Sequence, residues 1–243
     1  MPDRDDRDHR FSEGQDFTDP YEEFDIDPPA LSVDPDQVDP VDSRALPDLL
    51  DDAAFPDDAV DADTLIDVGL EYIGIKRFEQ ATETFERAAR FADDPLLEQE
   101  AWTNKGVAHA ELEEYDAAIG AYREAISIDE NSEHAAAAET NLAYALWESG
   151  HTEQALEHAE RAVEIDERSG QAWYNRGFFL LERGLAEDAL RCLDNATRLG
   201  YRTAEVLEEK ARAYEELGEY DQAEEVAEKA EAVRKAAEEE LLE

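Results

Sequence analysis

QAWYNRGFFLLERGLAEDALRCLDNATRLG, residues 171–200, contains two helical periods separated by a glycine. The first period places Trp173, Gly177 and Leu180 at positions i, i+4 and i+7, which share one face of an α-helix. Gly184 interrupts this pattern, and a second period with the same spacing follows it. The residues of the second period are Ala189, Leu193 and Ala196. The stretch therefore predicts two short helices joined by a tight turn.

Small residues stand where the two predicted helices must approach each other. Gly177 and Ala189 have almost no side chain, so the helix backbones can come close there, and Trp173 and Leu193 fill the space on either side. Gly200 ends the second period, at a position where a positive φ would cap a helix C-terminus. The segment is expected to fold as an antiparallel helical hairpin.

The same arrangement of small and large residues occurs five times. The small residues that anchor the five copies are spaced by 37, 37, 34 and 34 residues. They are Gly69, Gly106, Ala143, Gly177 and Ala211. A repeat of this length predicts a solenoid in which each unit stacks on the next.

The pattern resembles that of tetratricopeptide-repeat (TPR) proteins, whose unit of about 34 residues carries Trp or Leu, Gly, Tyr, Ala and Phe at set positions and closes on Pro. The resemblance covers residues 62–237, where every copy has most of the family positions, and the closing proline is absent at the matching position in all five. In its place stand Asp93, Glu130, Glu167, Tyr201 and Lys235. The resemblance implies an all-α, right-handed solenoid of five TPR helix hairpins.

The expected repeat region is 61–237. The five units are expected at about 62–98, 99–135, 136–169, 170–203 and 204–237. The first two periods are three residues longer than the others, which corresponds to roughly one helical turn. We expect this additional turn at the junctions between repeats, around 95–100 and 131–135.

Residues 1–60 have the composition of a disordered acidic arm. Eight of the nine prolines lie there among clustered aspartates, and apolar residues occur singly, so little apolar surface is available to offset the entropy of ordering. Residues 45–55, ALPDLLDDAAF, differ because their leucines have helical spacing. They are expected to lead into or cap the first repeat, with a docking motif for a partner or for the chain's own groove as the alternative.

The last repeat has no signal that would end its second helix. From Asp221 onward the sequence consists of helix-forming residues, with a stripe that includes Val226, Ala230 and Val233. We expect one long helix, ending in residues 238–243, whose polar face caps the open end of the solenoid. The alternative is a coiled-coil oligomerisation helix.

The net charge is −44, from 66 acidic and 22 basic side chains. The excess of acid is shared by the arm and the repeats, and only five of the basic residues are lysines. This composition resembles that of proteins from halophiles with molar salt in the cytoplasm, where screening reduces repulsion between surface carboxylates. An acidic scaffold for basic proteins is the alternative.

The sequence contains no catalytic, metal-binding or cofactor-binding pattern, so we expect a non-enzymatic protein without cofactors. Nucleic-acid binding requires clustered Lys and Arg, which are absent. No apolar run is long enough for a membrane span, and the N-terminus lacks the apolar core of a signal peptide. A soluble, cytoplasmic protein is the expectation, and the single cysteine, Cys192, is expected to be a semi-buried apolar residue.

In the family that this chain resembles, the first helices of the repeats line a groove that binds ligands. The resemblance places in that groove Thr103, Asn104, Val107, Thr140, Asn141, Tyr144, Trp147, Tyr174, Asn175 and Phe178. The three asparagines resemble the ladder with which other members hold the backbone of an extended peptide, with bridges between neighbouring first helices as the alternative role.

The sequence therefore predicts a scaffold, monomeric by expectation, that binds an extended peptide segment of a protein partner. The alternative is an assembly module whose groove binds its own arm or a second copy of the chain.

Overall fold

The structure is a computed structural model that describes residues 61–240. The predicted arm at 1–60, the segment at 45–55 and residues 241–243 lie outside the described residues.

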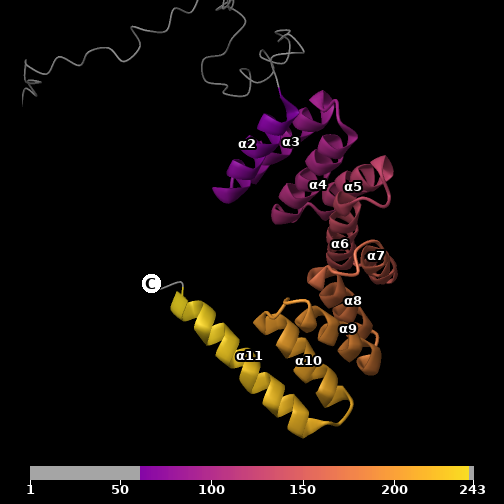
Figure 1. The fold of residues 1–243 in the computed structure, drawn as a ribbon, viewed down its shortest axis with the longest axis vertical. Helices are drawn as coiled ribbons and strands as arrows, with labels where there is room; N and C mark the ends of the chain where they lie inside the picture. Colours follow the sequence, from indigo (N-terminus) through magenta and orange to yellow (C-terminus); the bar gives the residue numbers. More distant parts are fainter. Residues whose placement is uncertain (1–60, 241–243) are drawn as a thin grey trace, which may run out of the picture. The chain divides into compact units, whose positions relative to one another are not determined.

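Ten α-helices and no strands occupy the described part of the chain (Figure 1). In chain order they are α2 (Ala62–Gly74), α3 (Phe78–Phe91), α4 (Pro95–Glu111), α5 (Tyr115–Ile128), α6 (Glu133–Glu148), α7 (Thr152–Ile165), α8 (Gly170–Glu182), α9 (Ala186–Arg198), α10 (Ala204–Glu216) and α11 (Tyr220–Glu240).

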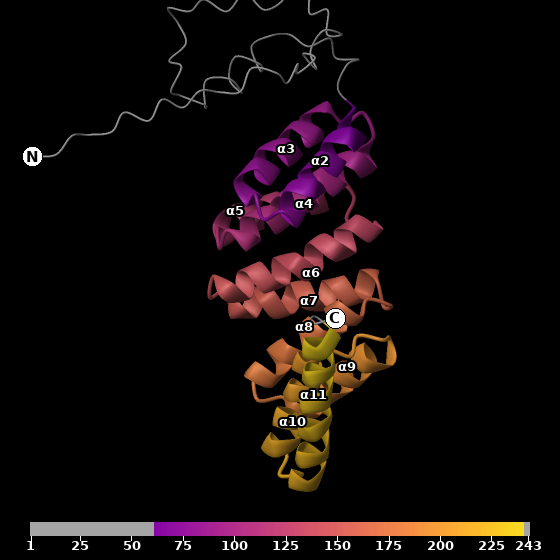
Figure 2. The same cartoon turned by 90° about the vertical axis from the view of Figure 1, so that its left-hand side faces the viewer.

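The helices form five consecutive hairpins. Within each hairpin the first helix packs on the second, and each second helix also packs on the first helix of the next hairpin. The first helices α2, α4, α6, α8 and α10 contact one another in series, whereas no two second helices pack together in the described region. The first helices therefore form one continuous surface, the first-helix face. Figures 1 and 2 show the hairpins stacked in chain order.

Glycine in the first helix makes room for a large side chain from the second helix, whereas the sequence pattern predicted a close approach of the two helix backbones there. A Cβ atom on Gly106 would lie 2.4 Å from Cε1 of Tyr122, which is far inside van der Waals contact. Tyr122, on α5, is buried in the main hydrophobic core. Gly69 accommodates the ring of Phe85 in the same way in the first hairpin.

Each turn within a hairpin contains one residue with a positive φ, which is glycine in three hairpins and a residue with a side chain in two. Gly150, Gly184 and Gly218 follow the first helices of the last three hairpins with φ values of 85°, 73° and 77°. Lys76 and Glu113 take the same left-handed conformation in the first two hairpins, with φ values of 59° and 60°. A side chain is disfavoured in this region of φ, so the first two turns carry strain that the others lack.

The additional residues of the first two repeats lengthen the following first helices at their N-termini. Helices α4 and α6 contain 17 and 16 residues, whereas α2, α8 and α10 contain 13 each. Helix α4 begins at Pro95, with the Asp94 side chain accepting a hydrogen bond from the Leu96 backbone nitrogen.

Gln99, which directly follows the additional turn of α4, joins two repeats through a buried side chain. Its Nε2 donates to the main-chain oxygens of Ala125 and Asp129, each at 2.8 Å, near the end of α5. Its Oε1 accepts a hydrogen bond from Oγ of Ser132, the residue that caps α6. Gln99 thus satisfies carbonyl groups that the end of a helix leaves without intrahelical partners.

Helix α11 is the longest in the described region, at 21 residues, and begins one residue before the predicted cap at Asp221. It packs on α10 (Figure 1). Ala223 and Ala230 are buried, while most of its remaining surface is charged and exposed.

Candidate functional site

Residues 61–240 contain neither a candidate metal site nor a candidate membrane-spanning helix. No group of three or more His, Cys, Asp or Glu side chains is placed to hold a metal ion there. None of the helices in this range combines the length and apolar character needed to cross a membrane.

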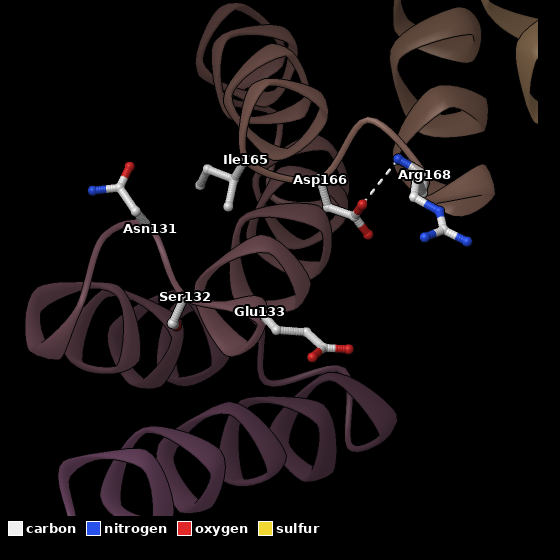
Figure 3. A pocket seen from close by; sticks show the side chains of 6 residues that line it. All are labelled: Asn131, Ser132, Glu133, Ile165, Asp166 and Arg168. Atoms are coloured by element: carbon white, nitrogen blue, oxygen red, sulfur yellow. Dashed lines mark hydrogen bonds between the residues drawn. The ribbon is translucent and has the colours of Figure 1, made fainter.

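A depression of about 380 Å³ lies where two inter-repeat turns approach each other (Figure 3). Its residues come from the turns before α6 and α8 and from the adjoining helix ends: Asn131, Ser132, Glu133, Ile165, Asp166 and Arg168. The Asp166 carboxylate accepts a hydrogen bond from the Arg168 backbone nitrogen at 2.9 Å, which is a local turn contact. The side chains in Figure 3 point in different directions and do not converge on a common centre. This depression therefore has the character of a repeat junction.

A larger depression, of about 480 Å³, lies on the first-helix face and is lined by five tyrosines. We call it the tyrosine depression. The residues that line it are Val107, Ala110, Glu111, Glu113, Tyr115, Tyr122, Asn141, Tyr144, Gln171, Tyr174, Asn175 and Tyr201. They come from three successive first helices, α4, α6 and α8, together with α5 and two connecting segments.

A smaller depression of about 200 Å³ adjoins the tyrosine depression and shares Asn141 and Gln171 with it. It contains Thr140 and Ser169, and it reaches the N-terminal turn of α6 at Glu133. The two depressions together extend over the first helices of three repeats, a span that suits an extended chain better than a small molecule.

Five of the ten site residues predicted from the sequence line the tyrosine depression. They are Val107, Asn141, Tyr144, Tyr174 and Asn175. Tyr144 is the most accessible of the tyrosines, with 48% of its surface exposed. The Tyr174 ring lies 5.8 Å from the Tyr201 ring, centroid to centroid, at an angle of 44°.

The other five predicted residues lie outside it. Thr103 and Thr140 are buried, and their hydroxyls donate to carbonyls of their own helices, those of Gln99 and Ala136. Trp147 and Phe178 contact each other edge to face at 5.2 Å and pack on the main core. Asn104 is half-buried and lines neither depression.

The three asparagines have different environments. Asn175 is 7% exposed, and its Nδ2 donates to the main-chain oxygen of Thr140 at 3.1 Å, which joins α8 to α6. The side chains of Asn104 and Asn141 form no hydrogen bond with another described residue. Asn175 thus has the bridging role, while the amide of Asn141 is available to a ligand.

The sequence reasoning missed Tyr115, Tyr122, Tyr201 and Gln171. Tyr115 and Tyr122 belong to α5 and fit the helix-packing pattern, so their access to the first-helix face left no separate signal. Tyr201 stands where the family has its closing proline, and that departure was the one available clue. A large aromatic side chain in place of proline follows α9 and faces the ring of Tyr174.

Burial and nearby carboxylates make the tyrosines of the depression poor acids. Desolvation, followed by the charges of Glu209 and other groups, raises the pKa of Tyr174 to about 12. Desolvation is also the main cause of the raised pKa of Tyr144, with smaller contributions from Glu148 and Glu111. The tyrosine hydroxyls of the depression therefore stay uncharged, while the glutamates around them give its rim a negative charge.

The described residues that line the tyrosine depression include two glutamates and no basic side chain. Arg212, on the next first helix α10, is held by carboxylates of Glu182, Glu209 and Glu216 at 2.5, 3.3 and 3.6 Å. An anionic ligand would meet no free cation here.

Comparison with known families agrees with this architecture. A family model described as tetratricopeptide repeat matches residues 97–168, and a second model of the same description matches residues 180–238. Together they cover more than half of the chain. The chain belongs to the tetratricopeptide repeat family. No curated protein matches this TPR chain in sequence.

Solved structures with the same fold cover most of the TPR chain. MamA from Desulfovibrio magneticus RS-1 is 17% identical with a TM-score of 0.59, covering 72% of this chain and 96% of its own. The Thermus thermophilus protein TTC0263, titled a thermophilic TPR protein, is 21% identical with a TM-score of 0.56. The match covers 71% of this chain and 91% of TTC0263. BtubC from P. vanneervenii is 17% identical with a TM-score of 0.61. The match covers 70% of this chain and 78% of BtubC.

These likenesses concern the fold, and they confirm the predicted class, an all-α right-handed solenoid of TPR hairpins. The five hairpins of α2–α11 match the predicted number of units. The predicted disorder of the arm concerns residues outside the described range.

Proposed function

We propose that this TPR protein is a non-enzymatic scaffold that binds an extended peptide segment of a partner protein along its first-helix face. The observation that carries the proposal is the pair of adjoining depressions spanning α4, α6 and α8. Membership of a repeat family whose units stack into long surfaces supports an interaction role.

The polar groups between the two depressions suit a peptide backbone. Asn141 and Gln171 line both, and each amide side chain offers one acceptor and two donors, which can pair with a peptide group whatever its side chain. The half-buried rings of Tyr115 and Tyr174 provide apolar contact area beside these amides. An extended ligand can therefore be held by its backbone and packed through its side chains.

In dilute salt, charge disfavours the alternative that the groove binds the chain's own arm. Residues 1–61 contain 21 acidic and 4 basic side chains, and the tyrosine depression is lined by Glu111 and Glu113. Two acidic surfaces repel each other unless salt screens them.

A selection from a displayed peptide library with the full chain tests the proposal. We expect enriched peptides whose affinity falls roughly threefold to tenfold in Asn141→Ala, which loses hydrogen bonds to the ligand but none to the protein. Asn104→Ala is the matched control, because Asn104 lines neither depression. If no peptide is enriched, or if binding is unchanged in both Asn141→Ala and Tyr144→Ala, the proposal is wrong.

A further inference from the structure

The tyrosine depression combines aromatic faces with a negative rim. The ring centroids of Tyr174 and Tyr201 are 5.8 Å apart with the rings inclined at 44°, and the exposed Tyr144 lines the same cavity. The face of an aromatic ring carries partial negative charge and attracts cations. Several such faces around one cavity form a site for a positive group.

Carboxylates surround these rings. Glu111 and Glu113 line the cavity, and Glu148 and Glu205 lie close enough to the tyrosines to raise their pKa values after desolvation. Carboxylates on α4, α6 and α10 thus lower the potential of the depression from three helices. An uncharged or anionic side chain gains nothing from this field.

A metal ion is a poor candidate for the cationic ligand, since no cluster of ligating side chains exists within the described range. An organic cation fits the aromatic lining and the volume of about 480 Å³.

We infer that the tyrosine depression binds a cationic side chain, that of arginine, from a basic peptide segment of the partner. This inference rests on the proposed function and names the chemistry of its ligand. Arginine suits the site better than lysine, because its planar guanidinium stacks on aromatic rings, is weakly hydrated, and pairs with carboxylates through two parallel hydrogen bonds. The amides of Asn141 and Gln171 lie beside it for the peptide backbone.

Stacking in a partly desolvated cavity also suits concentrated salt. At about 1 M salt the Debye length falls to roughly 3 Å, so attraction between exposed charges is largely screened, whereas contacts in partly buried sites are screened less. In concentrated salt, stacking on the tyrosine rings would therefore contribute more to binding than attraction to the carboxylates at the rim.

Isothermal titration of the full chain with capped alternating Ala–Arg peptides tests this inference. The comparison peptide replaces arginine by citrulline, which has nearly the same shape and no charge. With a net charge of −44 the chain attracts any basic peptide in dilute buffer, so the decisive titration is done in about 3 M KCl. We expect the arginine peptide to bind there at least about tenfold more tightly than the citrulline peptide.

Three variants separate the depression from the general surface charge. Tyr144→Ala should weaken the arginine peptide by about tenfold, while Tyr144→Phe, which keeps the ring, should stay within about twofold of wild type. Tyr220→Ala is the matched control, since Tyr220 is 70% exposed and outside the depression. It should bind as wild type does.

The outcomes distinguish this inference from the proposed function. If citrulline and arginine peptides bind equally, if Tyr144→Ala and Tyr220→Ala behave alike, or if the arginine peptide does not bind in concentrated salt, the cationic ligand is wrong. Library-selected peptides that still depend on Asn141 would then leave the proposed function standing. If those peptides also fail to bind, both proposals fall.

Discussion

Nδ2 of Asn175 donates a hydrogen bond to the main-chain oxygen of Thr140 across 3.1 Å, linking the first helices of the third and fourth repeats. The bond is buried, so its loss leaves a carbonyl lone pair without that partner.

Asn175→Ala should therefore lower the free energy of unfolding by roughly 0.5–1.5 kcal/mol. The side chain of Asn104 forms no hydrogen bond with a described residue, so Asn104→Ala should change the free energy of unfolding by less than about 0.5 kcal/mol. Guanidinium unfolding in a fixed concentration of KCl measures both. Equal effects of the two substitutions would show that the bridge to Thr140 contributes nothing.

Two glycines of the second hairpin should respond to alanine in opposite directions. Gly106→Ala places a methyl group against the ring of Tyr122, and such overpacking costs about 1–3 kcal/mol. Gly120 is exposed in α5 with nothing within 4 Å, so Gly120→Ala should stabilise by about 0.5–1 kcal/mol through the higher helix propensity of alanine. Thermal and denaturant unfolding test the pair, and a Gly106→Ala variant as stable as wild type would mean that Tyr122 moves freely.

Lys76 is strained by its φ of 59°, in a turn where later hairpins use glycine. Lys76→Gly should raise the free energy of unfolding by about 1 kcal/mol, because glycine adopts this conformation without the Cβ clash. Lys76→Ala removes the same charge but keeps the clash, and should give no comparable gain. If alanine and glycine stabilise equally, charge is the cause and the turn is unstrained.

Tyr122 should make the fold sensitive to alkaline pH. The residue is almost fully buried, and desolvation, together with Glu111, raises its pKa well above the ordinary value near 10. Its stabilising contribution is fully present below the unfolded pKa of about 10 and is lost as pH rises toward the folded pKa, because the unfolded chain loses its proton first.

The free energy of unfolding should accordingly fall as pH rises above about 10. In Tyr122→Phe, which has no proton to lose, the fall should be shallower over the same range. Denaturant unfolding of both proteins at several alkaline pH values measures the difference, and parallel curves would rule out Tyr122 as a source of the pH dependence.

The charge of −44 predicts dependence on salt as well. The melting temperature should rise steeply between about 0.1 M and multimolar KCl as repulsion between carboxylates is screened. A flat profile would contradict a halophilic origin and favour an acidic scaffold for basic partners.

The repeat architecture was accessible from the sequence because its signals are local. Gly106 and Tyr122 contact each other within one hairpin, and their spacing recurs with the repeat. The three additional residues of each of the first two repeats also lie near the predicted junctions. They form an extra turn at the N-termini of α4 and α6. The buried bonds of Gln99 to the end of α5 were not predictable, because they connect residues 26 and 30 apart without periodicity.

The candidate site was half predictable for a related reason. Helical periodicity assigns a residue to a face, and the resemblance to TPR proteins indicated which face forms the groove, so Tyr144 and Tyr174 were found. Periodicity does not give the tilt of neighbouring helices, so it could not separate buried Thr140 from accessible Asn141. Tyr201 follows the end of α9, where no period applies, and it approaches Tyr174 only through the stacking of repeats.

Amide hydrogen exchange of the full chain, with and without a library-selected peptide in concentrated KCl, tests the central claim most directly. The account predicts that peptide binding slows exchange in α4, α6 and α8, around Asn141 and Tyr174, and leaves the exposed face of α11 unchanged. Protection confined to the second helices α5, α7 and α9, or to α11, would contradict binding at the first-helix face.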